Sequence, residues 1–296
     1  MAPLISSQRK PLDATAYALM VLLTALWGFQ QVTIKVIVDD VSLLAQAAIR
    51  SLVATVLVVA WARLRGIPLF ERDGTLKAGL LAGFLFGVEF VFIYGGLAYT
   101  NASRMVVFIY LTPVLTALGL HFMVAGERLH PAQWLGVLVA FAGVVLAFFN
   151  SGKNTLVGDL CGIAAAFFWS ATTVLIRATR LAQASAAKTL FYQLGVSAAL
   201  LPLFSWFLGE KGVVALTPLA LASLAYQGVI VAFLSYLAWF WLLGRYLAAR
   251  LSVFSFLAPM FGVLFGVVFL REPLGPQFAI AAGLVALGIV LVNLRR

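Results

Sequence analysis

Two stretches of the sequence resemble each other strongly enough to decide the fold. Residues 102–113 read Ala-Ser-Arg-Met-Val-Val-Phe-Ile-Tyr-Leu-Thr-Pro, and residues 249–259 read Ala-Arg-Leu-Ser-Val-Phe-Ser-Phe-Leu-Ala-Pro. At an offset of 146, Pro113 aligns with Pro259, and Arg, Phe and Leu recur in the same register. Matches of Leu or Val arise easily by chance between apolar segments, whereas matched Arg and Pro do not. The pair indicates an internal duplication.

Further blocks repeat in the same order, which extends the duplication over most of the chain. They are Trp27 with Lys35 and Trp169 with Arg177, residues 127–131 and 272–276, and residues 143–146 and 288–291. We therefore expect a tail at 1–13, a first unit at 14–149 and a second unit at 150–296.

The composition places both units in a membrane. Of the 296 residues, 64% are apolar and 10% are charged, against about 45–50% and 25% in soluble domains. This excludes a water-soluble fold, a disordered chain, a nucleic-acid-binding domain and, with Cys161 the single cysteine, a disulfide scaffold. We predict an all-α membrane protein with ten transmembrane helices: 14–36, 43–62, 76–98, 104–123, 131–149, 157–177, 187–208, 217–243, 250–270 and 274–293.

The distribution of positive charge predicts the orientation. With the N-terminus inside, the inner side holds 14 of the 20 Lys and Arg residues and the outer side five, with Arg50 inside a span. The positive-inside rule then places both termini in the cytoplasm, which requires an even number of spans. Each unit has five spans, so the second begins on the opposite side of the membrane. Inverted repeats of this kind surround a central cavity in secondary transporters.

The motifs resemble the drug/metabolite transporter superfamily in its ten-span EamA form. The resemblance is carried by residues 26–29 (Leu-Trp-Gly-Phe), 102–113 and 126–129 (Gly-Glu-Arg-Leu), and by their second copies at 168–170, 249–259 and 271–274. The chain is most similar to the YddG-type exporters of aromatic and other amino acids in bacterial inner membranes. This resemblance implies a cavity lined by spans 1, 3, 4, 6, 8 and 9, and an inner-membrane location.

Two tryptophans and one acid are the principal candidates for the cavity. Trp27 and Trp169 lie roughly 18–20 Å into their spans, past the middle of a core about 30 Å thick; packing or an interfacial belt is the alternative. Glu89 lies well inside span 3, where a carboxylate is costly unless it is paired or protonated. It is a candidate for proton coupling or for binding a substrate ammonium, and the alternative is a structural pair with Arg50.

Other polar and aromatic side chains in the spans suit small zwitterions as a group, although packing explains each one alone. These further candidates are Gln30, Tyr94, Tyr99, Tyr110, Gln227, Tyr236 and Trp239. Close helix contacts are expected at Gly79, Gly83 and Gly87, and at Gly262 and Gly266. Pro113 and Pro259 are expected to kink their helices, as hinges or as static bends.

Charged residues at the span ends receive structural interpretations. Lys35 and Arg177 are expected to extend toward lipid headgroups. Glu127 and Glu272 are expected to cap the helices that begin at Pro131 and Pro276.

The sequence favours a transporter over an enzyme. His121 and His130 are the only histidines, and the chain has neither an H-E-x-x-H motif nor a P-loop, so we expect no metal and no cofactor. We predict an amino acid and metabolite exporter that works by alternating access as a monomer, with a small-molecule substrate, membrane lipids and no nucleic acid as partners. A multidrug or nucleotide-sugar carrier, a channel and a membrane enzyme are the alternatives.

Overall fold

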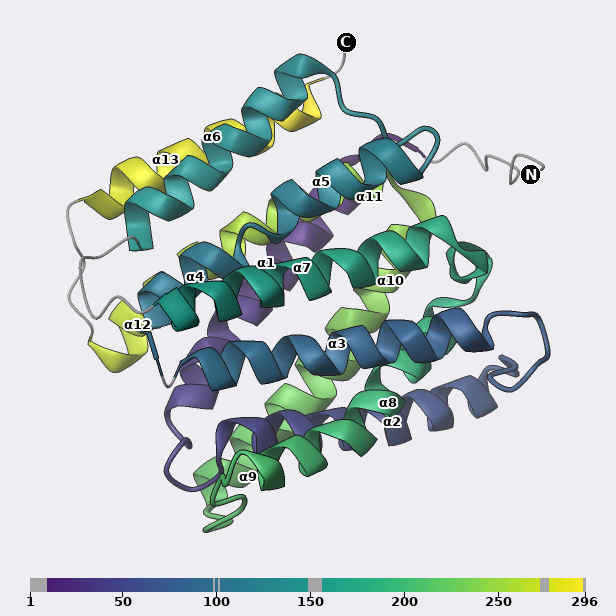
Figure 1. The fold of residues 1–296 in the computed structure, drawn as a ribbon, viewed down its shortest axis with the longest axis vertical. Helices are drawn as coiled ribbons and strands as arrows, with labels where there is room; N and C mark the ends of the chain where they lie inside the picture. The colour runs from purple at the N-terminus through teal and green to yellow at the C-terminus, as the bar shows by residue number, and fades with distance from the viewer. Residues whose placement is uncertain (1–9, 98, 101, 149–155, 272–276, 295–296) are drawn as a thin grey trace.

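The computed structural model describes residues 10–294 apart from 98, 101, 149–155 and 272–276 (Figure 1). Within these residues the chain is helical, with two isolated β-bridges and no strand. The elements are α1 (Ala14–Lys35), α2 (Leu43–Leu64), α3 (Leu76–Gly96), α4 (Ala102–Ile109), α5 (Thr112–Met123), α6 (Pro131–Phe148), α7 (Leu156–Ala178), η1 (Arg180–Gln183), α8 (Ala186–Phe207), α9 (Pro218–Ala225), η2 (Tyr226–Ser235), α10 (Tyr236–Arg245), α11 (Ala248–Ser252), η3 (Val253–Phe256), α12 (Leu257–Leu270) and α13 (Gln277–Asn293).

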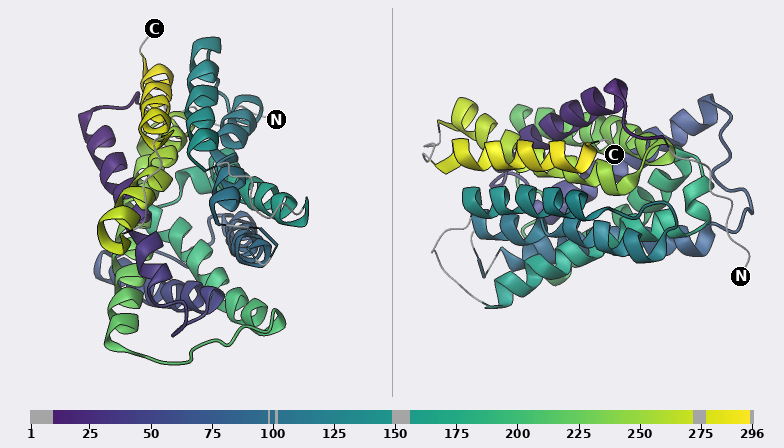
Figure 2. Two further views of the ribbon diagram at one scale, coloured as in Figure 1. Left: turned by 90° about the vertical axis from the view of Figure 1, so that its left-hand side faces the viewer. Right: turned by 90° about the horizontal axis from the view of Figure 1, so that it is seen from above.

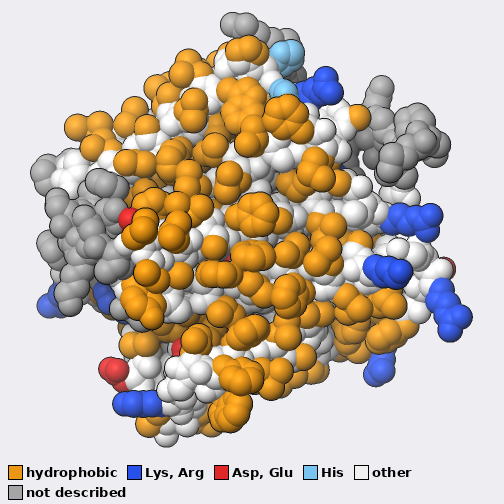
Figure 3. All heavy atoms as spheres, in the orientation of Figure 1, with side chains coloured by type: hydrophobic (Ala, Val, Ile, Leu, Met, Phe, Trp, Pro, Cys, Tyr) orange, Lys and Arg blue, Asp and Glu red, His pale blue; other side chains and the backbone are white. Residues whose placement is uncertain are grey.

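The helices have the length and apolarity of membrane spans. Among the described residues, eight helical segments are long and apolar enough to cross a bilayer, and Pro131–Ala147 and Gln277–Asn293 are shorter apolar helices. Figure 3 shows hydrophobic side chains over the middle of the visible face, with Lys and Arg at its two ends. An apolar outer surface of this extent suits lipid contact. The protein is a multi-pass membrane protein.

Helices α6 and α13 pack against each other through glycines, and Figure 2 shows them side by side. A Cβ at Gly136 would lie 2.8 Å from the Gly288 carbonyl oxygen, and one at Gly143 would lie 2.7 Å from that of Ala281. As residue numbers rise along α6, those of its partner fall, so the two helices are antiparallel.

Helices α2 and α8 are also antiparallel, because the end of α8 meets the start of α2, and the start of α8 meets the loop that follows α2. At one side of the bundle, the Glu210 carboxylate, just after α8, accepts from the Ser42 hydroxyl at 2.8 Å and from the Leu44 backbone N–H at 3.1 Å. At the other side, the Lys188 ammonium near the start of α8 donates to Asp73 at 2.7 Å. We call the side of the bundle on which α1 begins the N-terminal side, and the other side the opposite side.

The predicted glycine positions lie at helix contacts of differing tightness. A Cβ at Gly79 or Gly83 would come within 2.5 Å of Tyr192 on α8, whereas one at Gly87 would meet α8 atoms only at 3.5 Å or beyond. A Cβ at Gly262 would lie 3.7 Å from the Gly28 carbonyl oxygen of α1. Gly266 is buried in α12.

Two spans are interrupted just before the matched prolines. Pro113 lies in the first turn of α5, after a break that separates α4 from α5. Pro259 lies in α12, which follows the short 3₁₀ segment η3. Proline removes a backbone donor and favours such breaks. The span from Pro218 to Arg245 differs, because its middle ten residues, η2, form a π-helix.

Candidate substrate cavity

A cavity of about 290 Å³ lies among the helices. Its lining comes from α1, α2, α3, α4, α7, α8, α10 and η3, so both sequence units contribute. Eight of the ten predicted cavity residues line it: Trp27, Gln30, Glu89, Tyr94, Tyr110, Trp169, Tyr236 and Trp239.

The other two predicted residues lie elsewhere. Tyr99 follows α3 and is 53% exposed. Gln227 is fully buried in a separate polar contact, where its amide nitrogen donates to Gln46 Oε1 at 2.9 Å and to the Ser223 hydroxyl at 3.1 Å. Gln227 therefore ties η2 to α2 and is not in the cavity wall.

Aromatic rings from both units form much of the cavity wall. The centre of the Trp27 ring lies 5.8 Å from the ring centre of Trp239 and 6.4 Å from that of Tyr236, and both contacts are edge-on. The Trp27 indole N–H donates to the Ser235 hydroxyl at 2.9 Å. Tyr110 meets Trp169 edge-on at 6.3 Å. Because each ring packs against another, the wall holds its shape and presents a fixed apolar surface.

Two opposite charges line the same cavity. Arg50 on α2 is 3% exposed, and Glu89 on α3 is 4% exposed. The two side chains form no ion pair with each other, so the direct pair weighed from the sequence is absent among the described residues. The Arg50 guanidinium instead lies 4.5 Å from the centre of the Phe90 ring.

Several lining residues were not predicted from the sequence. Arg50 lines the cavity in its own right and not only as a possible partner for Glu89, and a cation inside a span was the signal that could have shown this. Gln193, on α8, lines the cavity at the position that corresponds to Arg50 when the equally long helices α2 and α8 are aligned. Thr172 and Thr173, one turn beyond Trp169 on α7, gave no signal that distinguished them from packing residues.

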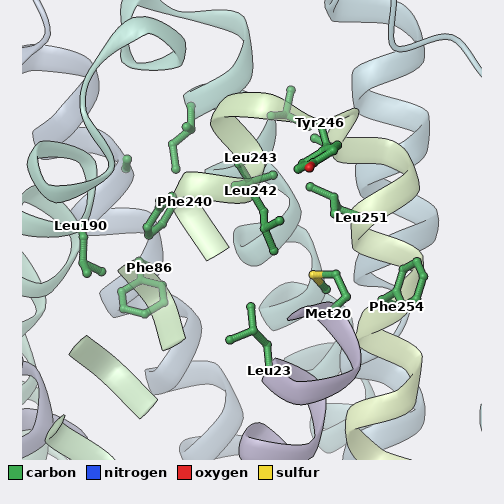
Figure 4. Close-up of a cluster of buried hydrophobic side chains, with 14 of the residues drawn as sticks. Met20, Leu23, Phe86, Leu190, Phe240, Leu242, Leu243, Tyr246, Leu251 and Phe254 are labelled. Atoms are coloured by element: carbon green, nitrogen blue, oxygen red, sulfur yellow. The ribbon is translucent and has the colours of Figure 1, made fainter. Parts of the chain in front are cut away.

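The cavity is closed toward the N-terminal side. Met20 and Leu23 of α1 lie with Leu242 and Leu251 in the buried cluster drawn in Figure 4, and all four are at most 2% exposed. In the other direction, the lining reaches Ile34, Leu43 and Leu97, which lie at the opposite-side ends of α1, α2 and α3. The structure thus has the geometry of a pocket sealed on one side of the bundle.

An ionic contact on the N-terminal side corrects two expectations. Arg177 is 7% exposed and does not reach toward headgroups; it forms a buried ion pair with Glu127. Glu127 does not cap the helix at Pro131, because its carboxylate accepts from the backbone N–H groups of Ala248 and Ala249 at 3.1 and 3.2 Å. The carboxylate therefore binds the first turn of α11, far along the chain, where the helix dipole favours negative charge. Glu272 lies outside the described residues.

A second polar contact closes the loop before α3. The Lys188 ammonium, on a side chain that is 3% exposed, donates to Asp73 and to the Glu71 carbonyl oxygen at 3.0 Å. Hydrogen bonds from Lys188 and Thr75 hold the pKa of the Asp73 carboxyl well below its usual range. The contact ties this loop to the start of α8.

No metal site is formed in the part of the chain that the structure describes, which holds no group of three His, Cys, Asp or Glu side chains placed for an ion. What the described residues do form is a bundle of apolar helices around a polar and aromatic cavity. This is the organisation of a membrane transporter.

The chain belongs to the EamA-like transporter family, whose sequence model matches residues 14–149 and again 156–294. It is 23% identical over 287 residues to a probable amino-acid metabolite efflux pump of Escherichia coli, covering 93% of this chain and 91% of that one. It is 28% identical over 290 residues to an uncharacterized transporter of Archaeoglobus fulgidus, covering 92% and 94%. A solved crystal structure shares the fold, with a TM-score of 0.80, 23% identity and coverage of 95% of this chain and 96% of that one.

Proposed function

We propose that this protein exports amino acids and related metabolites across a bacterial inner membrane by alternating access. The observation that carries the proposal is a cavity that combines an aromatic wall with one buried cation and one buried anion. Neutral zwitterions with an apolar side chain match both features. The name of the Escherichia coli relative, a probable amino-acid metabolite efflux pump, supports the same substrate class, as does the similarity to YddG-type exporters.

Alternating access requires two related halves, and we propose that the units at 14–149 and 150–296 are inverted repeats of five spans. At an offset of 145, Gly136 corresponds to Ala281 and Gly143 to Gly288. The two close contacts, Gly136 with Gly288 and Gly143 with Ala281, are therefore equivalent: replacing each residue of one contact by its counterpart in the other unit gives the other contact. Such reciprocal contacts between antiparallel helices are expected of a pseudo-two-fold axis in the membrane plane.

We propose that the pocket faces the outside in this structure. This assignment combines the closed N-terminal side with cytoplasmic termini, which the excess of Lys and Arg on that side favours. Export then needs the reverse state, in which the contacts around Met20, Leu23 and Glu127 separate. Pro113 and Pro259, at the helix breaks of matched spans, are the proposed hinges.

The test is uptake of a panel of labelled amino acids into proteoliposomes, with and without a pH gradient. We expect saturable uptake and counterflow of neutral amino acids, led by aromatic ones. Flux without saturation or counterflow would indicate a channel, and uptake of none of the amino acids would refute the substrate assignment. If Glu89 couples export to protons, Glu89→Gln changes the pH profile of flux, and an unchanged profile would eliminate that role.

A multidrug carrier is the second candidate, and the aromatic wall favours it. The two fixed charges argue against it, because apolar drugs would leave both unsatisfied in a buried site. Inhibition of amino acid uptake by lipophilic cations, with no amino acid transported, would favour this alternative.

A further inference from the structure

Arg50 and Glu89 lie at the same depth in the bundle. Arg50 is seven residues from the opposite-side end of α2 at Leu43, and Glu89 is seven residues from the opposite-side end of α3 at Gly96. At 1.5 Å per residue, each charge is about 10 Å from that end. Because both side chains line the cavity, one ligand can meet the two charges together.

Neither side chain is satisfied by its neighbours. The Arg50 Nε and Nη2 atoms and the Glu89 Oε2 atom are buried without a hydrogen-bond partner. Among the described residues, neither one forms an ion pair within 4.0 Å with an oppositely charged side chain. A buried charge without a partner is strongly unfavourable, so intramembrane charges are normally paired or functional. The ring of Phe90 stabilises the Arg50 cation in part but supplies no acceptor.

A structural ion pair does not account for this arrangement. Two groups that stabilise each other would close to hydrogen-bond distance, as Arg177 and Glu127 do on the N-terminal side. Arg50 and Glu89 instead stay apart on two helices and share the cavity between them. The arrangement leaves room for a group that carries both a negative and a positive charge.

We infer that Arg50 binds the carboxylate and Glu89 the ammonium of an α-amino acid, while its side chain lies against the aromatic wall of Trp27, Tyr236 and Trp239. The inference rests on the proposed function and adds the chemistry of recognition. A guanidinium matches a carboxylate through two parallel hydrogen bonds, and a carboxylate matches an ammonium as a charged acceptor. Ligand binding then supplies both missing partners at once.

The recognition site is asymmetric between the two sequence units. Gln193 occupies the position on α8 that corresponds to Arg50 on α2, and it also lines the cavity. An uncharged amide there cannot replace the guanidinium as a strong carboxylate partner. The charged end of the substrate is therefore held by the first unit, and its apolar end faces rings that include Trp239 of the second.

The experiment compares three labelled ligands that share one ring: phenylalanine, phenethylamine, which lacks the carboxylate, and 3-phenylpropionate, which lacks the ammonium. Binding to purified protein and counterflow in proteoliposomes are measured for each. We expect the wild type to prefer phenylalanine by about tenfold or more over both analogues, because each lost charged contact reduces affinity by about that factor.

Variants of the two residues then assign the roles. Arg50→Gln is expected to weaken phenylalanine binding about tenfold to a hundredfold and to leave phenethylamine binding unchanged. Glu89→Gln should weaken phenylalanine similarly and spare 3-phenylpropionate. Arg65→Gln, at the far end of α2, and Glu71→Gln, in the exposed loop after it, are matched controls that should behave as wild type. Arg50→Lys keeps the charge without the planar fork and should be intermediate.

The outcomes separate the two proposals. If the wild type moves none of the three ligands or any other amino acid, the proposed function fails. If it moves phenylalanine but Arg50→Gln weakens phenylalanine and phenethylamine equally, the recognition roles are wrong while amino acid export stands. Should a variant not fold, the analogue series on the wild type still decides, because equal affinity for all three ligands overturns the inference.

Discussion

We expect the carboxylate of Glu127 to hold the N-terminal side of the bundle closed, and Glu127→Gln tests this directly. The substitution preserves the shape of the side chain but removes its charge, and it leaves the buried Arg177 without an anionic partner. Glu127 Oε1 accepts from Arg177 Nε at 3.1 Å, and both carboxylate oxygens accept from the first backbone N–H groups of α11. Those groups belong to segments that must separate if the pocket is to open on this side.

The size of the effect follows from burial. Both side chains are at most 4% exposed, and removal of one member of a buried pair costs about 3–5 kcal/mol. If the contact exists only in the closed state, a loss of about 3 kcal/mol raises the ratio of open to closed molecules about 150-fold. If it exists in both states, the loss appears as lower stability with no change in accessibility.

The assay measures how fast a buried thiol is labelled by a polar maleimide. In a Cys161→Ser background, Leu23→Cys places a thiol at a position that is 2% exposed on the closed side. We expect Glu127→Gln to raise the labelling rate steeply, and Glu127→Gln with Arg177→Met to raise it less, since no charge is then left unpaired. Equal labelling and equal melting temperature with and without Glu127→Gln would refute the reasoning.

Three further predictions concern packing, pH and the proline breaks. Gly288→Ala places a Cβ about 2.5 Å from backbone atoms of α6, so we expect a loss of about 1–3 kcal/mol in thermal unfolding; Gly283→Ala, with open space at its Cβ on the same helix, should be neutral. Because folding lowers the pKa of Asp73, its carboxylate stabilises the protein fully above pH 3.8, the usual pKa of the group, and this stabilisation is lost as the pH falls from there towards the lowered pKa. Melting temperatures of Asp73→Asn measured against pH should lack this acid-dependent decrease. A decrease of the same size in the variant would contradict the assignment. Pro113→Ala and Pro259→Ala should reduce flux more than purified yield, and an equal reduction of both would indicate static bends.

The positions of most helices along the chain could be predicted from the sequence because hydropathy and charge mark each apolar segment locally. The predicted range 43–62 is observed as Leu43–Leu64, and the range 187–208 as Ala186–Phe207. Apolar length and flanking charge act within one segment, so no knowledge of neighbouring helices is needed.

Side-chain partners could not be predicted in the same way, because they come from distant segments. Glu127 binds donors 50 and 121 residues away, and Gln227 binds Gln46 across 181 residues. The sequence alone does not specify which neighbouring helix each side chain faces. Arg50 is the opposite case, because its position inside a span was already informative, and only the ion pair with Glu89, considered as an alternative, is not formed.

The third span of the second unit contains the π-helix Tyr226–Ser235, whereas α3, the third span of the first unit, is α-helical throughout. A π-turn accommodates one more residue than the α-turn it replaces. Rewinding it would leave a surplus residue, and everything beyond would rotate by about 100°, the angular step of one α-helical position. Tyr236 and Trp239 follow this segment, so the rotation would move both rings away from Trp27. It would also break the hydrogen bond from the Trp27 indole to Ser235, the last residue of the π-helix.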